Sequence, residues 1–267
     1  MSLSINTNIN ALDAQRNLNK TENSLAMSME RLSSGLRINS AADDVAGYAI
    51  NQRLQAQING LQQAQQNSQD AVALAQTAQG SLNTVEQMLQ RVRELAVQDA
   101  NGTNSEADKE AIEGEVKELY AEIKRDGETA SFNGIKLLEG GEEITFQVGA
   151  NGGETEQIKV KTFELGGTVE EVKLGKEETI EEIETQIAEV AKAAGEFGSV
   201  QDRLQYTQAN LETFTQNLSA AQSSIVDVNM AAEVTNFTKE QVLQSAGVSV
   251  LTQANHLPQA VLKLLEG

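Results

Sequence analysis

The sequence predicts a mainly α fold, a long antiparallel helical rod or coiled coil with a small β-hairpin region in the middle of the chain. Three observations lead to this prediction. Two segments far apart in the chain carry apolar residues at spacings that alternate between three and four, the pattern of a coiled-coil seam. Further amphipathic segments occupy both ends. Aromatic residues are only 3% of the 267, so most apolar content is aliphatic and suits helices packed side by side.

The first predicted element is an amphipathic helix near the N-terminus. Its apolar residues include a leucine in every seventh position, and they are Ile5, Ile9, Leu12, Leu18, Leu25 and Leu32. The run Ser33-Ser34-Gly35 is poor helix material and should end this helix. Ser40 followed by Asp43 is a capping-box-like pair, which predicts that a second helix starts near residue 42.

The second predicted helix is long and carries the stronger seam. Its apolar positions alternate in steps of four and three without a miss, at Ala71, Ala75, Ala78, Leu82, Val85, Leu89, Val92 and Ala96. Leu54, Ile58 and Leu61 extend the same face backward. Turn chemistry at Asn101-Gly102 should end the helix. A shorter helix near residues 105–125 follows, with Ile112, Val116, Leu119 and Ile123 on one face.

The middle of the chain changes character. Asn133-Gly134 predicts a turn, and Ile144, Phe146 and Val148 then alternate with polar residues, as do Ile158 and Val160. The glycine-rich run 149–153 between them predicts a β-hairpin. We also expect a short strand near residues 169–174.

A second seam follows the hairpin. Its positions are Leu204, Thr207, Leu211, Phe214, Leu218, Ala221, Ile225, Val228 and Ala232, on a helix expected to begin near residue 178. Near the C-terminus, one more helical face carries Val250, Ala254, Leu257, Val261 and Leu264. The two long helices should pair antiparallel, which would bring both ends of the chain to the same end of a rod.

The charge is distributed unevenly. The net charge is −19, and residues 101–200 alone contain 24 acidic and ten basic residues. An acidic middle must face water, whereas nearly neutral ends can pack together. Without a basic patch, nucleic acid is not an expected partner. No apolar run is long enough to cross a membrane, so membrane insertion is not expected either. The first residues also lack the pattern of a standard secretory signal peptide.

The two terminal segments present apolar stripes that nothing else in the chain would cover. Exposed stripes of this length indicate an interface, and copies of the same chain are the obvious cover. A head-to-tail contact of this kind propagates into a helical filament. The expected assembly interface is therefore Ile5, Ile9, Leu12, Leu18, Leu25, Leu32, Val250, Ala254, Leu257, Val261 and Leu264.

Several stretches resemble bacterial flagellin, in a short form that lacks large outer domains. They are INTNINAL (5–12), RLSSGLRINSAADDVAG (31–47), LQRVRELAVQ (89–98), SFNGIKLL (131–138), FQVGAN (146–151) and FTKEQVLQSAGVSVLTQANHLPQAVLKLL (237–265). The resemblance covers roughly residues 1–150 and 195–267. It implies a structural subunit that self-assembles into the flagellar filament for motility, with terminal helices that fold on polymerisation.

The resemblance also implies a division of the chain into five parts. These are an inner-tube helix and spoke (1–41), outer-tube helices (42–142), a β-hairpin region (143–176), a second outer-tube part (177–225) and a C-terminal inner-tube helix (226–267). The spoke would include the small or polar residues Ser34, Gly35, Asn39 and Asp43.

Partners follow from the same resemblance. They are other copies of the chain, an export chaperone at the C-terminal helix, and the filament cap and junction proteins. Secretion would proceed without a cleaved signal peptide, to an extracellular filament. Arg91, Leu95 and Glu115 match a surface that a host Toll-like receptor recognises on flagellins, although an ordinary helix surface that packs against the next subunit is the favoured explanation of their native role.

Two other functions compete with the filament subunit. A hook–filament junction protein shares the terminal plan, and an enzyme could be grafted onto the same scaffold. The region between the matching segments shows no nucleophile, base or metal constellation, so we expect no catalytic, cofactor-binding or metal-binding residues. The single histidine, His256, has no partner set nearby in the sequence and is expected to be structural.

Overall fold

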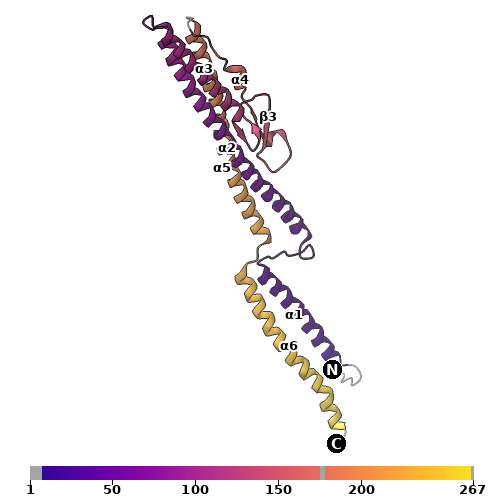
Figure 1. The fold of residues 1–267 in the computed structure, drawn as a ribbon. Helices are drawn as coiled ribbons and strands as arrows, with labels where there is room; N and C mark the ends of the chain where they lie inside the picture. The colour runs from indigo at the N-terminus through magenta and orange to yellow at the C-terminus, as the bar shows by residue number, and fades with distance from the viewer. Residues whose placement is uncertain (1–7, 175–177, 266–267) are drawn as a thin grey trace. The chain divides into compact units, whose positions relative to one another are not determined.

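The structure is a computed structural model and confirms the mainly α class (Figure 1). It describes residues 8–174 and 178–265, and the side chains of all of these except 178 and 257–265. The helices are α1 (Ile9–Ser34), α2 (Val45–Asp99), α3 (Glu106–Thr129), α4 (Leu165–Thr168), α5 (Glu178–Val226) and α6 (Met230–Leu265). The strands are β1 (Ser131–Phe132), β2 (Ile135–Lys136), β3 (Glu143–Gln147) and β4 (Gln157–Lys161), and a 3₁₀ turn covers Glu154–Glu156.

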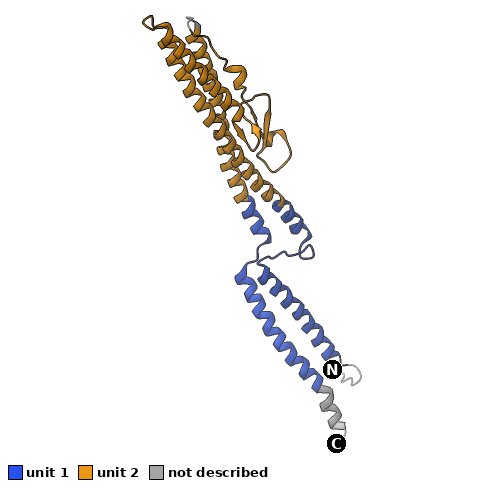
Figure 2. Ribbon diagram, viewed as in Figure 1, with its two compact units in different colours: residues 1–55, 218–267 blue, residues 56–217 orange. Residues whose placement is uncertain are grey.

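The described residues form two compact units, coloured separately in Figure 2. One comprises residues 1–55 and 218–267, and the other comprises residues 56–217. Among the described residues, no helix combines the length and the apolar character that a membrane span requires.

In the unit of residues 56–217, α2 and α5 pack antiparallel. The guanidinium of Arg93 lies 2.6 Å from the Glu184 carboxylate. A Cβ on Gly198 would meet the side chain of Gln79, at 3.7 Å. Residue 93 of α2 therefore lies opposite residue 184 of α5, and residue 79 lies opposite residue 198. The same number of residues separates the two contacts on each helix. The two helices keep one register over this length.

The predicted seam of α2 is the centre of this unit's core. All eight of its members, from Ala71 to Ala96, are buried, and Leu82, Val85, Leu89 and Val92 are completely inaccessible. They pack in one cluster with Ile183, Val190, Phe197 and Leu204 of α5. The long-helix prediction and its buried face are confirmed, and Asn101-Gly102 follows the end of α2 as expected.

α3 packs its predicted face on the same core. Its N-terminus is held by a capping box, because the Ser105 hydroxyl accepts from the Asp108 amide while the Asp108 carboxylate accepts from the Ser105 amide. Ile112, Val116 and Ile123 are buried, as predicted. Leu119 is half-buried at the edge.

Both predicted turns and the hairpin are confirmed. β1 and β2 are joined by Asn133-Gly134, whose φ angles of 49° and 83° suit the two-residue hairpin turn that favours Asn-Gly. β3 pairs antiparallel with β4, with Ile144 opposite Val160 and Phe146 opposite Ile158. The alternation in the sequence therefore identified the buried face of this hairpin.

The short strand expected near residues 169–174 is wrong. The chain instead forms the one-turn helix α4 and then continues without regular structure to residue 174. Side chains hold this segment in place of a strand partner. The Gln186 amide donates to the Glu170 carbonyl at 2.9 Å, and the Thr179 hydroxyl donates to the Lys173 carbonyl at 3.0 Å. Val169, Val172 and Leu174 pack on the core as a strap.

The hairpin loop lies directly on α2. The Asn67 amide donates to the Gln147 carbonyl at 2.9 Å, and a Cβ on Gly60 would lie 2.9 Å from the Cβ of Ala150. Glu156 organises the loop, since its carboxylate accepts from the Asn151 amide and side chain. A glycine inside a helix normally costs stability, so Gly60 has a packing reason.

Gly60→Ala is expected to destabilise the unit of residues 56–217, although alanine favours helices. Overpacking costs about 1–3 kcal/mol, more than the roughly 1 kcal/mol that alanine contributes to a helix. Gly80→Ala is the matched control, because a Cβ there meets nothing within 4 Å. Urea unfolding followed by circular dichroism should show Gly60→Ala less stable and Gly80→Ala more stable than the parent. An equal gain in both would contradict the docking of the loop.

In the other unit, α1 and α6 run antiparallel. The side-chain amide of Asn8 donates to the Ala254 carbonyl at 2.8 Å, and Leu18 contacts Gly247 closely. Leu36 and Asp227 form an antiparallel bridge beyond the last turn of α1. Gln222 of α5 donates to Asn51 and Gln55 of α2, at 2.7 and 2.8 Å.

The second predicted seam is only partly correct. Leu204 and Leu211 are buried and Thr207, Leu218 and Ile225 are half-buried, but Phe214 and Ala221 are exposed. A straight α-helix drifts by about 20° per heptad relative to a strict seam. The series 207, 214, 221 rotates out of the contact in this way. The helix also ends at Val226, so Val228 and Ala232 do not continue it.

Candidate functional site: helix breaks and exposed terminal faces

The first helix break ends α1 with a left-handed residue. Gly35 has φ 74°, and its amide donates to the Arg31 carbonyl. Glycine takes this conformation without the steric cost that other residues carry. Ser34 also stabilises the end of the helix, because its hydroxyl accepts from the Leu36 amide at 3.1 Å. The small residues therefore end the helix as predicted.

The first break is hydrogen-bonded to a second break between α5 and α6. The Arg37 amide donates to the Val226 carbonyl at 2.6 Å, and the Val228 amide donates to the Gly35 carbonyl at 3.0 Å. The Arg37 guanidinium donates to the Ile225 carbonyl at 2.5 Å. Ile38 and Val226 are buried beside these bonds. The break between α1 and α2 and the break between α5 and α6 therefore lie side by side, and each supplies hydrogen-bond partners for backbone groups of the other.

The turn that restarts the chain is built on Asp43. Its carboxylate accepts from the Ser40 amide at 2.9 Å, the Ser40 hydroxyl at 3.0 Å and the Asn39 amide at 3.2 Å. These bonds, that of the Ser40 amide above all, lower the pKa of Asp43. The Asn39 side chain donates to the Ser34 hydroxyl at 3.0 Å. Three of the predicted spoke residues, Ser34, Asn39 and Asp43, are therefore linked in one local network, whereas the backbone bonds of Gly35 go to Arg31 and Val228.

Ser40 does not cap the new helix, which corrects the predicted start. The pair with Asp43 forms, but in the preceding turn. Asp44 is the cap, because its carboxylate accepts from the amides of Ala46 and Gly47, both at 3.0 Å. Gly47 fits tightly there, since a Cβ would lie 2.6 Å from both Asp44 and Ile38. The adjacent acidic residues Asp43 and Asp44 are the sequence signal for the start of this helix, and Asp44 is the one that caps it.

The contact between α1 and α6 is thin. Ala14 and Ala254 are its buried apolar residues, and no large apolar side chain in the described parts of these helices is fully buried. Of the predicted interface, Leu18, Leu25 and Leu32 are half-buried toward α6. Ile9, Leu12 and Val250 are exposed. Ile5 lies outside the described residues, as do the side chains of Leu257, Val261 and Leu264.

Further exposed apolar side chains were missed because they do not follow the predicted stripes. They are Met27 and Met29 on α1, and Val234, Val242, Leu243 and Val248 on α6. At about 100° per residue, Leu243 and Val250 fall on one flank of α6, Val234 and Val248 on the other, and Val242 opposite α1. A helix that is apolar all round is normally enclosed on all sides.

The predicted receptor surface is only partly exposed. The Arg91 guanidinium contacts the Glu115 carboxylate at 3.0 Å, so α2 and α3 do bring these two residues together. The bond to Glu115 raises the pKa of Arg91. Leu95, however, is only 2% exposed and belongs to the core. Its expected place on the surface is wrong, because α3 packs over that side of α2.

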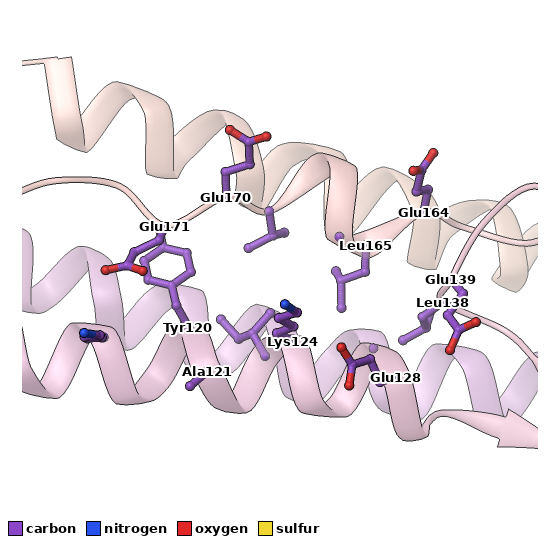
Figure 3. A pocket seen from close by; sticks show the side chains of 15 residues that line it. Tyr120, Ala121, Lys124, Glu128, Leu138, Glu139, Glu164, Leu165, Glu170 and Glu171 are labelled. Carbon is purple, nitrogen blue, oxygen red and sulfur yellow. The ribbon is translucent and has the colours of Figure 1, made fainter.

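A groove of about 500 Å³ lies between α3 and residues 164–171. In Figure 3 the side chains of Tyr120 and Leu165 point into it, while the carboxylates of Glu164 and Glu170 point away. Its other polar groups include Lys117 and Lys124 on the rim. Within the described part of the chain, no group of three or more histidine or carboxylate side chains is arranged to hold a metal ion.

Tyr120 anchors the strap beside this groove. Its hydroxyl donates to the Gln186 side chain at 3.2 Å, and Gln186 in turn holds the Glu170 carbonyl. Tyr120 is 6% exposed, and its burial raises the pKa of the phenol to about 12. The folded state therefore favours the neutral phenol, whose pKa in an unfolded chain is about 10.

This shift predicts alkaline destabilisation centred on Tyr120. Because its pKa is higher in the folded state, its contribution is complete below pH 10 and is lost as the pH rises through about 12. Tyr120→Phe should cost about 1 kcal/mol at pH 7 through the lost hydrogen bond. It should also remove part of the stability loss above pH 10. Urea unfolding of both proteins from pH 7 to 11 measures this, and parallel curves would contradict it.

The family model described as the bacterial flagellin N-terminal helical region matches residues 5–143, and that of the C-terminal helical region matches residues 180–265. A flagellin of Halalkalibacterium halodurans is 43% identical and covers 98% of this chain and 99% of its own length. A flagellin of Bacillus subtilis is 37% identical, with 98% and 99% covered. The crystal structure of Bacillus cereus flagellin covers 59% of this chain and 94% of its own, at 28% identity and a TM-score of 0.48.

Proposed function

The chain belongs to the bacterial flagellin family, and from this premise we propose how it assembles. The protein is a structural subunit of the bacterial flagellar filament, which is a homopolymer. We propose that α1 and α6 form its main assembly surface. The observation that carries this proposal is the set of exposed apolar side chains on all sides of that helix pair.

The energetics favour enclosure by other copies. Each large aliphatic side chain that becomes fully buried contributes about 1.5–3 kcal/mol. At least nine large apolar residues of α1 and α6 are exposed in the single chain, so their burial offers a gross gain on the order of 10–25 kcal/mol. Ordering the backbone of the two helices costs about 1–2 kcal/mol per residue, which the thin contact between α1 and α6 does little to offset. The helices should therefore become stable only when neighbouring subunits surround them.

The break segments take the role of a spoke in this proposal. Ser34, Gly35, Asn39 and Asp43 are small or polar, and the bonds of Arg37 join the two chain segments at one place. Such a linked pair connects the terminal helices to the central ones with few bulky side chains. The proposed division at residues 41/42 and 225/226 is supported by the nearby helix breaks, which lie between Ser34 and Val45 and between Val226 and Met230, and the hairpin region 143–176 completes the five proposed parts.

The remaining partners are proposals that rest on family membership. Secretion without a cleaved signal peptide would deliver the chain to the outside of the cell, and an export chaperone would cover the apolar faces of α6. The filament cap and junction proteins would contact the ends of the polymer. A host Toll-like receptor would contact Arg91 and Glu115, with Leu95 acting only through the packing beneath them.

Electron microscopy of the purified protein under polymerising conditions tests the proposal. Helical filaments are the expected result, and a protein that stays monomeric at high concentration would contradict it. The observations give no reason to favour a hook–filament junction protein, and copy number separates the two, because a junction needs only a few copies per flagellum. Flagellins are structural proteins, so we propose no catalytic role; a peptidase assay on filaments checks this.

A further inference from the structure

The methionines of the chain are distributed unevenly between its surface and its core. The sequence contains five, and four of them lie in the described residues. Met27 and Met29 of α1 and Met230 of α6 are 47%, 55% and 49% exposed, whereas Met88 of α2 packs against the core. Within the described ranges, every methionine with an exposed side chain therefore lies on the two terminal helices.

The exposed methionines lie beside the contact between α1 and α6, not within it. Ser28 is only 6% exposed and marks the face of α1 that meets α6. At about 100° per residue, Met27 and Met29 fall on the two opposite flanks of this face. Met230 is the first residue of α6. A small oxidant dissolved in water therefore reaches these three side chains in the single chain.

The composition of the chain directs a peroxide to methionine. The sequence contains no cysteine and no tryptophan, so the thioether is its most readily oxidised side chain. The sulfur lone pair attacks one oxygen of hydrogen peroxide, the O–O bond breaks, and a proton transfer releases water. The sulfur loses two electrons and becomes a sulfoxide, while the peroxide gains them. The product is a polar side chain in place of an apolar one.

We propose that Met27, Met29 and Met230 are oxidation sites that control assembly, and that hydrogen peroxide acting on them in the free chain blocks its entry into a filament. The inference rests on the proposed function, because it needs copies that enclose α1 and α6. In the free chain, water solvates the sulfoxide oxygen. Enclosure removes that water, and a buried polar group without a hydrogen-bond partner is unfavourable. Enclosure also excludes the oxidant, so subunits already in a filament are protected.

Treatment of monomers with dilute hydrogen peroxide, followed by its removal, tests the effect on assembly. Peptide mass spectrometry should find Met27, Met29 and Met230 oxidised before Met88. The critical concentration for polymerisation should rise at least about tenfold, and methionine sulfoxide reductases A and B, one for each sulfoxide epimer, should restore it. The oxidised monomer should keep the parent's melting temperature, because the oxidised side chains are exposed. In filaments the same three residues should oxidise at least about tenfold more slowly.

Matched variants assign the effect to these three residues. The triple variant Met27→Leu, Met29→Leu and Met230→Leu nearly conserves apolar volume, so it should polymerise like the parent both before and after peroxide. Met88→Leu should remain as sensitive to peroxide as the parent. Normal polymerisation of the oxidised parent, a triple variant that peroxide still blocks, or equal oxidation rates in monomers and filaments would overturn the inference. An untreated parent that forms no filaments would instead contradict the proposed function.

Discussion

Val242→Asp is expected to abolish filament formation while leaving the isolated chain as stable as the parent. Val242 is 63% exposed in the single chain and lies on the side of α6 opposite α1. An aspartate there remains solvated in the monomer and costs little. In a filament that encloses α6 it would be an unpaired buried charge, for which the effective penalty is several kcal/mol per ion. Every subunit would carry this penalty.

The control for Val242→Asp is Thr185→Asp, at an exposed position in the acidic first part of α5. This segment should face water in the polymer, so Thr185→Asp should form filaments at the parent's critical concentration. Sedimentation and electron microscopy measure both variants. Normal filaments from Val242→Asp would contradict the enclosure of α6, whatever the state of the other surfaces.

Leu89→Ala should have the opposite profile, with a large loss of stability in the monomer. Leu89 is completely inaccessible and sits in the middle of the α2 seam, in contact with the main core cluster. Large-to-small changes at such sites cost about 2–5 kcal/mol through lost transfer energy and the cavity left behind. Urea unfolding of the monomer, followed by circular dichroism, measures the change.

Leu12→Ala is the matched substitution in α1, where the leucine is exposed. It should change monomer stability by no more than about 0.5 kcal/mol, yet raise the critical concentration for assembly. Leu89→Ala and Leu12→Ala together separate the core that folds the chain from the surface that assembles it. Equal destabilisation of the monomer by both would mean that α1 is part of the folded core.

The sequence was most informative where one face of an element is completely buried. The α2 seam and the β3–β4 hairpin were both identified residue by residue, because burial on one side enforces a strict apolar period. The Asn133-Gly134 turn was predicted equally well, since few residues adopt the positive φ angles that this turn requires. In each case the local pattern and the tertiary packing require the same residues.

Prediction failed where tertiary contacts replace a local pattern. The strap at residues 169–174 has the composition of a strand, but Gln186 and Thr179, in the first turns of the following helix α5, hold its carbonyl groups. The exposure of Phe214 and the burial of Leu95 depend on which faces the neighbouring helices cover. The spacing of apolar residues in the sequence does not show which face of a helix its neighbours cover. The break after α5 did have a sequence signal, because Asn229 caps α6 through its side chain. The predicted apolar spacing continues across this break, so spacing alone places both segments in one helix.

Hydrogen exchange in monomers and in filaments tests the central claim most directly. The claim is that α1 and α6 are stable only when other copies enclose them. Amides of residues 9–34 and 230–256 should be at least about a hundredfold better protected in filaments, equivalent to about 3 kcal/mol. Amides of residues 71–96 should be equally protected in both states. Full and equal protection of the terminal helices in the monomer would contradict the account.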